Sequence, residues 1–374
     1  MSRSLSRRGT LSLLGAGVAG LSLPMPTGLA RTKKTSGLAG IARQSGLLYG
    51  ASAGGEIFEN PAYRQLYLDE TAILTTDVAL KFDWIRPQRK IWDFSRADRL
   101  LKFTKANALA MRGHTLIWNE NAPDWLKTLS RRDIRYEFDR HIDKVTARYA
   151  GQFHSWDVVN EPFWPGHGKT GGYRTGPWLE AMGSGYVARA FRRAAAVDPA
   201  VKLVLNEAHT ERNDEVGKTI RASLLRLVDR LLEEGAPLHA IGLQGHLQPG
   251  KPYDDNVFTD FLWQINSRGL AIYITEFDIN DETYPANLDQ RDQRVALRGY
   301  TFLKKILKVP AVQMVVNWQL ADPYSWYADL ARSGQLRSRR EPRPLPFDNA
   351  YRRKPLWTAM ARAMAGRPRL RGSL

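Results

Sequence analysis

Cysteine is absent from the 374 residues of the chain. A chain without cysteine has no disulfides, no thiolate nucleophile and no cysteine-ligated zinc or iron–sulfur site. Any chemistry must therefore come from carboxylates, histidines, hydroxyls, amides or a metal held without thiolates.

Histidine spacings typical of metal sites are also missing. The seven histidines form neither an H-x-H nor an H-E-x-x-H pattern, and these are the spacings that place two imidazoles on one metal ion. No G-x-G-x-x-G turn follows the first expected strand, which argues against a dinucleotide-binding sheet. We therefore expect neither a metal nor a cofactor.

Apolar runs long enough to cross a bilayer do not occur in the sequence. The run at residues 11–23 is too short and too rich in glycine. It follows Arg7 and Arg8 and precedes Pro24 and a small-residue segment at 28–30, which is the pattern of an export signal. Paired arginines before the apolar run indicate the twin-arginine route. An ordinary signal that carries two arginines by chance is the alternative.

Acidic residues are too few to balance the basic ones, because 55 Lys and Arg stand against 38 Asp and Glu, a net charge of +17. A basic excess favours nucleic-acid binding where the charges cluster. Here they are interleaved with acidic residues, and the densest run, Arg337, Arg339 and Arg340, is short and lies between Gly334 and Pro342. This run is typical of a solvated loop, and we expect no nucleic-acid partner.

Short apolar runs of the β type alternate with longer segments of helical periodicity over most of the chain. This alternation is typical of parallel βαβ units, and eight of them predict an α/β fold, a (β/α)8 TIM barrel, rather than a doubly wound sheet. The expected strands are residues 47–51, 73–78, 108–116, 154–160, 202–206, 240–244, 271–276 and 312–318. The expected helices between them include residues 94–107, 134–149, 186–197, 216–235, 257–268 and 291–307.

The expected organisation is a single barrel domain with short flanking segments. We predict a removable export signal at 1–30, a polar linker at 31–37, one catalytic domain at 38–366 and a basic tail at 367–374. The mature protein is expected to be periplasmic or extracellular, soluble and monomeric, with no membrane contact once the signal is removed.

Polar side chains stand at nearly every expected strand end, where the active site of such a barrel lies. They are Asp77, Lys81, Arg112, His114, Trp118, Asn160, Glu161, Asn206, Glu207, Gln244, His246, Glu276 and Trp318.

Two of these residues, Glu161 and Glu276, follow buried strands that face each other across the barrel. A carboxylate in such a place costs desolvation unless it is paired or functional. Taken alone, each could form an ion pair with Arg112, Lys81 or Lys202. Taken together, they provide the acid and the carboxylate that cleavage of a glycosidic bond requires.

Aromatic and imidazole side chains near the two carboxylates fit the same chemistry. Trp118, Trp318 and Trp326 can stack on sugar rings, although each can also be a core residue. His114 and His246 can bond sugar hydroxyls or a carboxylate, and a neutral histidine beside Glu276 can set its charge state.

Several ordered motifs resemble those of family ten of the glycoside hydrolases, the endo-β-1,4-xylanases. They are residues 112–118, 156–161, 244–246, 274–279 and 318–326, and the resemblance extends from about Leu47 to Trp357.

The resemblance implies roles for individual residues. Glu161 would be the acid/base and Glu276 the nucleophile, with the two carboxylates about 5 to 5.5 Å apart and the anomeric configuration retained. Asn160 would bond a sugar 2-hydroxyl, His246 would orient the nucleophile, and Gln244 would lie near the acid/base. The remaining residues that the resemblance assigns to substrate binding are Asp77, Lys81, His114, Trp118, Asn206, Trp318 and Trp326.

The sequence also departs from the family pattern. Val78 replaces an asparagine that contacts the second glycone sugar, Asn119 and Asn121 replace a histidine and a glutamine, and Ala208 replaces a tyrosine. We therefore expect a retaining endo-1,4-β-xylanase whose partner is a polysaccharide, xylan or a related β-glycan. The alternatives are the same mechanism on another β-1,4-glycan or on short xylo-oligosaccharides, and, more remotely, a non-catalytic carbohydrate-binding barrel.

Overall fold

A computed structural model describes residues 37–338 and 340–368 of the chain. The expected export signal, the linker before Gly37, Arg339 and tail residues 369–374 lie outside the described residues. Within the described ranges, no helix is both long enough and apolar enough to cross a membrane.

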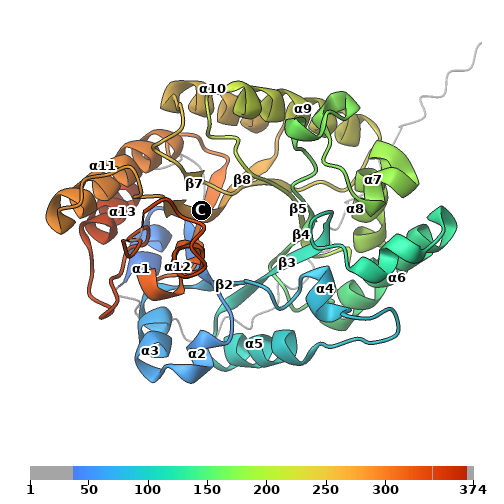
Figure 1. Cartoon of the computed structure of the whole chain (residues 1–374), viewed down its shortest axis with the longest axis horizontal. Helices are drawn as coiled ribbons and strands as arrows, with labels where there is room; N and C mark the ends of the chain where they lie inside the picture. The colour runs from blue at the N-terminus through green and yellow to red at the C-terminus, as the bar shows by residue number, and fades with distance from the viewer. Residues whose placement is uncertain (1–36, 339, 369–374) are drawn as a thin grey trace, which may run out of the picture. The chain divides into compact units, whose positions relative to one another are not determined.

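The strands form one parallel sheet that closes on itself through the pairing of β6 with β8. Around the sheet the order is β6-β5-β4-β3-β2-β1-β9-β8, and Figure 1 looks into the resulting barrel. All eight expected strands are confirmed. A further two-residue strand, β7, pairs in parallel with the end of β8. The strands are β1 (Leu48–Ala53), β2 (Ile73–Thr76), β3 (Ala110–Trp118), β4 (Ser155–Asn160), β5 (Lys202–Glu207), β6 (Ala240–Leu243), β7 (His246–Leu247), β8 (Ala271–Ile279) and β9 (Val312–Asn317).

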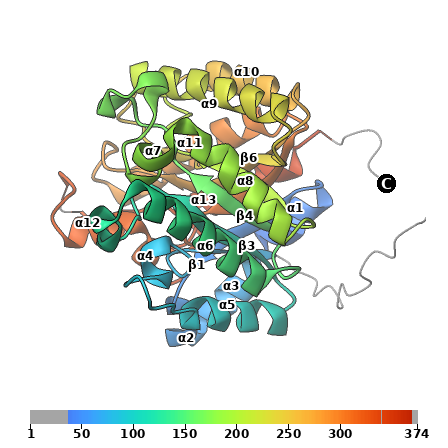
Figure 2. The same cartoon turned by 90° about the vertical axis from the view of Figure 1, so that its right-hand side faces the viewer.

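Helices surround the barrel and cover the outer face of its strands (Figure 1). In the perpendicular view, α6 and α8 run across the outside of β3 and β4 (Figure 2). The six expected helices are confirmed as α5 (Ser95–Ala106), α6 (Arg131–Tyr149), α8 (Tyr186–Val197), α9 (Glu215–Glu233), α10 (Asp255–Asn266) and α11 (Leu288–Ile306). The further helices are α1 (Leu38–Gln44), α2 (Glu56–Glu59), α3 (Pro61–Glu70), α4 (Phe82–Ile85), α7 (Pro177–Met182), α12 (Trp326–Arg332) and α13 (Pro355–Ala365).

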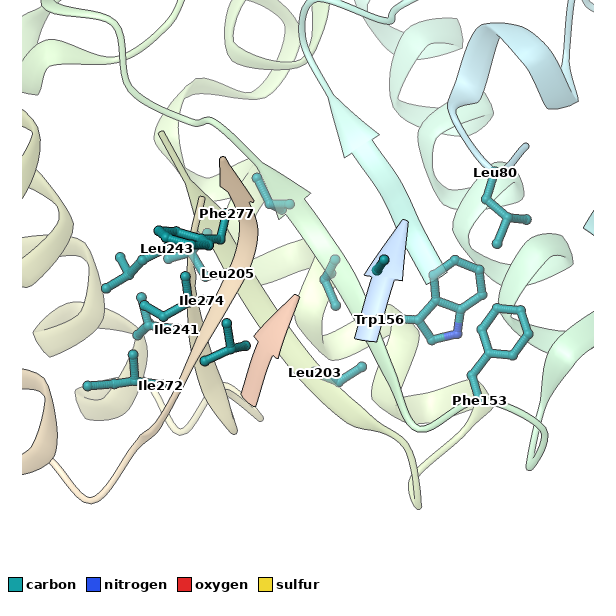
Figure 3. Packing of buried hydrophobic residues seen from close by; sticks show 14 of the residues in the cluster. Leu80, Phe153, Trp156, Leu203, Leu205, Ile241, Leu243, Ile272, Ile274 and Phe277 are labelled. Carbon is teal, nitrogen blue, oxygen red and sulfur yellow. The ribbon is translucent and has the colours of Figure 1, made fainter. Parts of the chain in front are cut away.

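Alternation along the strands divides the core into two parts. Successive side chains of a strand point to opposite faces, so Leu203 and Leu205 join the large cluster under the helices, whereas Val204 belongs to a separate small cluster. That small cluster also contains residues of four other strands, Ile73, Ala240, Tyr273, Met314 and Val316. Figure 3 shows part of the large cluster, including Ile241, Leu243, Ile272 and Ile274 from β6 and β8. Because both faces are buried, the strands appear in the sequence as continuous apolar runs.

Helix α9 illustrates how the local sequence fixes the helices. The side chain of Asp214 accepts a hydrogen bond from the backbone N–H of Gly217 (3.1 Å) and so caps the first turn. Apolar residues three or four positions apart then form one buried stripe toward the sheet. They are Ile220, Leu224, Leu227, Val228 and Leu231. Gly235, with φ of 64°, follows the helix in the left-handed conformation that terminates helices.

The end of the described chain returns to the base of the barrel, opposite the carboxyl ends of the strands. Arg367, assigned from the sequence to a basic tail, is buried and donates to the carbonyls of Ser45 and Gly46 before β1 and of Pro310 and Val312 at the start of β9. Helix α13 packs against α1 and α11 in the same region.

A buried ion pair connects α13 to the segment after β9. Lys354, immediately before α13, donates to both carboxylate oxygens of Asp322 (3.0 and 2.8 Å) and to the carbonyl of Arg343 (2.7 Å). The side chains of Lys354 and Asp322 are 3% and 0% exposed, so neither charge has water to replace its partner.

We predict that Lys354→Met destabilises the protein by about 3 to 5 kcal/mol, because the buried Asp322 carboxylate then keeps only Arg343, whose Nη1 is 4.0 Å away, as a cation. The loss is measured as a lower midpoint of urea unfolding with an unchanged slope. The matched control is Lys127→Met, which breaks the exposed pair with Asp124 and should leave the midpoint unchanged. Equal midpoints for Lys354→Met and wild type would contradict the prediction.

Candidate active site

Glu276, near the end of β8, is a buried carboxylate held by one amide and one imidazole. Asn206 Nδ2 donates to its Oε1 (2.8 Å), and His246 Nε2 lies 3.2 Å from its Oε2. Burial alone would raise the pKa of Glu276, but the His246 hydrogen bond, the charges of His114 and His246 and the Asn206 hydrogen bond together lower the pKa to about 2. Glu276 is therefore ionised across the neutral range.

His246 lies between two carboxylates. Its Nδ1 is 2.9 Å from Oδ1 of Asp278, and β7 places it directly opposite Asp278 in the register with β8. Burial lowers the pKa of His246, but the charges and hydrogen bonds of Asp278 and Glu276 outweigh burial and hold the pKa well above its usual value. The two carboxylates therefore favour a charged imidazole, in contrast to the neutral histidine that the sequence analysis considered beside Glu276.

Glu161 follows β4 and lies in a different electrostatic environment. Gln244 Nε2 donates to its Oε1 (2.7 Å), and Arg174 Nη2 donates to its Oε2 (2.8 Å). Burial raises the pKa of Glu161; Arg174 and Gln244 oppose that increase, and Glu120 and Glu276 add to it, so that the net shift is upward. Glu161 therefore keeps its proton to a higher pH than Glu276 does.

Two asparagine amides connect the two carboxylates. Asn206 Nδ2 donates to Glu276 and also to Oδ1 of Asn160 (2.8 Å), and Asn160 Nδ2 donates to Glu161 Oε1 (3.3 Å). Thr275 Oγ1 donates to Asn206 Oδ1 (2.7 Å), which fixes the orientation of the Asn206 amide. These bonds place the two carboxylates at the ends of one hydrogen-bonded chain.

Residues after three strands adopt left-handed backbone conformations. Glu161 has φ of 48°, His209 of 59° and Gln319 of 69°, and they follow β4, β5 and β9. Such conformations are uncommon for residues with a Cβ and are concentrated at functional sites. At Glu161 the backbone N–H still donates to the carbonyl of Asn206 (2.9 Å), so the turn remains bonded to the sheet while the side chain is redirected.

Arg112, one of the cations considered from the sequence as a partner for the two glutamates, forms its ion pair elsewhere. It pairs with Asp157 on β4, and His114 Nδ1 lies 2.8 Å from the other oxygen of the same carboxylate. Both bonds follow from the register, which sets Arg112 opposite Ser155 and His114 opposite Asp157. The cation that contacts Glu161 is Arg174, in the loop between β4 and α7.

The other predicted binding residues lie on both sides of this centre. Lys81 Nζ is 5.1 Å from the ring centre of Trp118 and 6.0 Å from that of Trp318. The Trp326 indole N–H donates to Asp278 Oδ2 (2.7 Å), and its ring centre is 5.3 Å from that of His246. Trp118 and Trp326 are partly exposed, whereas Trp318 is nearly buried.

Asp77, the last predicted binding residue, follows β2 and accepts a hydrogen bond from Gln319 Nε2 (3.0 Å). It is therefore held by the segment after β9 rather than by the two glutamates.

Residues at the departures from the family pattern have internal partners. Asn119 is buried and donates to the hydroxyl of Tyr186 (3.4 Å), and Asn121 donates to Asp83 (3.3 Å). Ala208 is buried, and its neighbour His209 lies with its ring centre 5.5 Å from that of Trp164. A partly exposed indole thus stands near the position where the family tyrosine is missing.

Glu207 is a further buried acid that the sequence analysis named at a strand end but gave no role. Its two oxygens accept from the backbone N–H groups of Phe163 (3.2 Å) and Ala208 (2.8 Å). Burial and the charge of Glu161 raise its pKa well above the usual value. Arg174 and Glu120 were missed entirely, because only their long-range contacts distinguish them from ordinary surface charges. Asp157 was noted only as part of the motif at 156–161, without a partner or a role.

Comparisons with known proteins agree in one family. The model of glycosyl hydrolase family 10 matches residues 37–363. The chain is 29% identical over 306 residues to a β-1,4-xylanase of Dictyoglomus thermophilum, covering 79% of this chain and 83% of the relative. It is 30% identical over 346 residues to endo-1,4-β-xylanase 1 of Humicola insolens, covering 90% of this chain and 76% of the relative.

The fold agrees with solved structures of the same kind. Xylanase 10B of Thermotoga petrophila, solved with xylobiose, superposes with a TM-score of 0.78 at 25% identity, covering 89% of this chain and 98% of that one. A thermostable mutant of a xylanase from Cellvibrio japonicus superposes with a TM-score of 0.77 at 28% identity, covering 88% and 100%.

We predict that His246 stays protonated through neutral pH and that Asp278→Asn lowers its pKa, because one of the two flanking negative charges is removed. Nitrogen-15 NMR of the imidazole measures the titration directly. The same spectra are recorded for wild type and for Asp278→Asn. A wild-type His246 that deprotonates on the acid side of neutrality would rule out the charged imidazole.

Proposed function

Since the chain belongs to glycosyl hydrolase family 10, we propose that it is an endo-1,4-β-xylanase that cleaves internal bonds of xylan with retention of configuration. One observation carries this proposal. Glu161 and Glu276 are buried at one hydrogen-bonded centre, yet their pKa values are shifted in opposite directions. Such a pair can supply a proton and a nucleophile at the same pH.

In the first step, Glu161 donates its proton to the glycosidic oxygen as the bond to the anomeric carbon breaks. The Glu276 carboxylate attacks that carbon from the opposite face and forms a glycosyl ester. His246, paired with Asp278, holds the Glu276 carboxylate in position and neutralises part of its charge. The leaving sugar departs with the proton of Glu161.

In the second step, ionised Glu161 takes a proton from water, and the resulting hydroxide attacks the ester carbon. Glu276 leaves as the carboxylate, and the two inversions together retain the β configuration. The Asn160 amide, which accepts a hydrogen bond from Asn206, would bond the 2-hydroxyl of the sugar being cleaved.

Xylan as the substrate is supported by the names of the relatives and by the side chains around the centre. Trp118, Trp318 and Trp326 offer rings for the apolar faces of sugars, and the Lys81 ammonium can donate hydrogen bonds to sugar hydroxyls. Val78 and Ala208 remove an amide contact and an aromatic ring that the family pattern contains. This loss favours, as the second candidate, the same mechanism on another β-1,4-glycan or on short xylo-oligosaccharides.

Export before action on the polymer is part of the proposal. It rests on Arg7 and Arg8 before the apolar run at 11–23. Replacing Arg7 and Arg8 by lysine should block export through the twin-arginine route and leave precursor of full length in the cytoplasm. Normal export of the lysine variant would mean an ordinary signal.

We predict that the mature protein releases reducing sugar from xylan and that Glu276→Ala lowers kcat on the order of 10⁴-fold or more, because no nucleophile remains. Glu233→Ala, at an exposed helical position, is the matched control and should retain full activity. Parallel rates on mixed-linkage glucan and on short xylo-oligosaccharides separate the two candidates. A higher kcat/KM on glucan than on xylan would reject xylan as the substrate.

Glu161→Ala should show an effect that depends on the leaving group. We expect kcat/KM to fall by about 10²- to 10⁴-fold on xylan, which needs protonation of the leaving oxygen, and far less on an aryl xylobioside with an acidic phenol. Azide can then attack the glycosyl ester in place of water and yield a β-glycosyl azide. An α-configured azide product, or an equal loss on both substrates, would contradict these roles.

A further inference from the structure

The guanidinium of Arg174 is shared between Glu161 and a second acid. Its Nη2 donates to Glu161 Oε2 (2.8 Å), its Nε donates to the main-chain carbonyl of Glu161 (2.9 Å), and its Nη1 pairs with Glu120 Oε1. All three nitrogens of the guanidinium are therefore used. The side chain is 4% exposed, so the arginine is a buried bridge between the two acids.

Glu120 and Glu161 differ sharply in their access to water. The Glu120 side chain is 52% exposed and that of Glu161 is 12% exposed. The Glu120 carboxylate is therefore in contact with water, whereas ionisation of the buried Glu161 carries a desolvation cost.

The backbone on both sides of the bridge is fixed. Asn119, which precedes Glu120, packs under Gly176, where an added Cβ would lie 2.4 Å from Asn119 Oδ1. On the other side, the backbone N–H of Arg174 donates to the carbonyl of Pro162 (2.8 Å), next to Glu161. The three charged groups are consequently held by short connections to β3 and β4.

We propose that Glu120 is a positioning residue for the reaction, which binds one arm of Arg174 and thereby limits how strongly that arginine stabilises the Glu161 carboxylate. This inference rests on the proposed role of Glu161 as acid/base. Glu120 itself touches neither the substrate nor the reacting atoms in this role.

The charges that face Glu161 come from four parts of the fold. Arg174, from the loop before α7, lowers the pKa of Glu161, whereas Glu120, after β3, and Glu276, on β8, raise it. Glu207, on β5, is the fourth and interacts unfavourably with ionised Glu161. An unshared arginine beside Glu161 would favour the ionised form, which is needed only in the second step. Glu120 offsets that preference and keeps the proton available for the first step.

Opposite charge changes should therefore move the pH profile in opposite directions. Glu120→Gln removes a negative charge, so the alkaline limb of kcat/KM moves to lower pH. Arg174→Gln removes the positive charge, so the limb moves to higher pH. A residue that served only the fold would lower the rate at every pH and leave the limb in place.

The experiment measures kcat/KM from pH 4 to 10 with an aryl xylobioside that has a poorly acidic phenol. For Glu120→Gln we expect a fall of about two- to five-fold on the alkaline limb, the range for a half-exposed charge pair, and no change on the acid limb. In the Arg174→Gln background the same substitution should have little effect, because the bridge is already broken. Glu233→Gln is the matched control and should leave both limbs unchanged.

Failure of this inference can be told apart from failure of the proposed function. Glu161→Ala, measured on an aryl xylobioside with an acidic phenol, should lose the alkaline limb. If that limb persists, Glu161 is not the acid and the proposed function fails with the inference. If the limb is lost in Glu161→Ala but Glu120→Gln and Arg174→Gln leave it unmoved, only the role of Glu120 is overturned. Because Glu120 is half-exposed, its variant remains informative even if Arg174→Gln does not fold.

Discussion

Removing two carboxylates from water within one small space is the constraint on which the site depends. Burial penalises the charged form of each, and each negative charge also disfavours the other. The protein compensates the two unequally. Glu276 has a charged imidazole and an amide, whereas Glu161 has two amides and an arginine that it shares with Glu120. Because the compensation is unequal, Glu161 and Glu276 differ in proton affinity although both are buried.

Closure of the sheet makes such a crowded site possible. Pairing of β6 with β8 brings the ends of strands that are distant in sequence into one ring. Asn206, Glu161 and Glu276 then reach one another from β5, β4 and β8, although their positions span more than a hundred residues. The apolar clusters inside the barrel and under the helices hold the strands in place. The packing of the strands therefore positions the hydrogen-bonded side chains between Glu161 and Glu276.

The barrel could be predicted because its strands are buried on both faces and therefore read as apolar runs bounded by turns. The ring of polar strand ends could be predicted because this topology puts all carboxyl ends together. Partners could not. Arg112 was considered as one possible partner of either glutamate, but in the structure it pairs with Asp157. Arg174 lies 13 positions beyond Glu161 in a loop whose path no local pattern indicates. The charge of His246 also depends on Asp278, which approaches it only through the short β7 pairing.

The hydrogen bonds of Arg367 fix a point of attachment at the end of the described chain. They hold the last described residues beside Ser45 and Gly46, at the face opposite the carboxylates. A bead, a surface or a second protein attached there would leave uncovered the end of the barrel that holds Glu161 and Glu276. A short peptide that joined this segment to α1 would permit circular permutation, with new ends opened in an outer loop and the centre untouched.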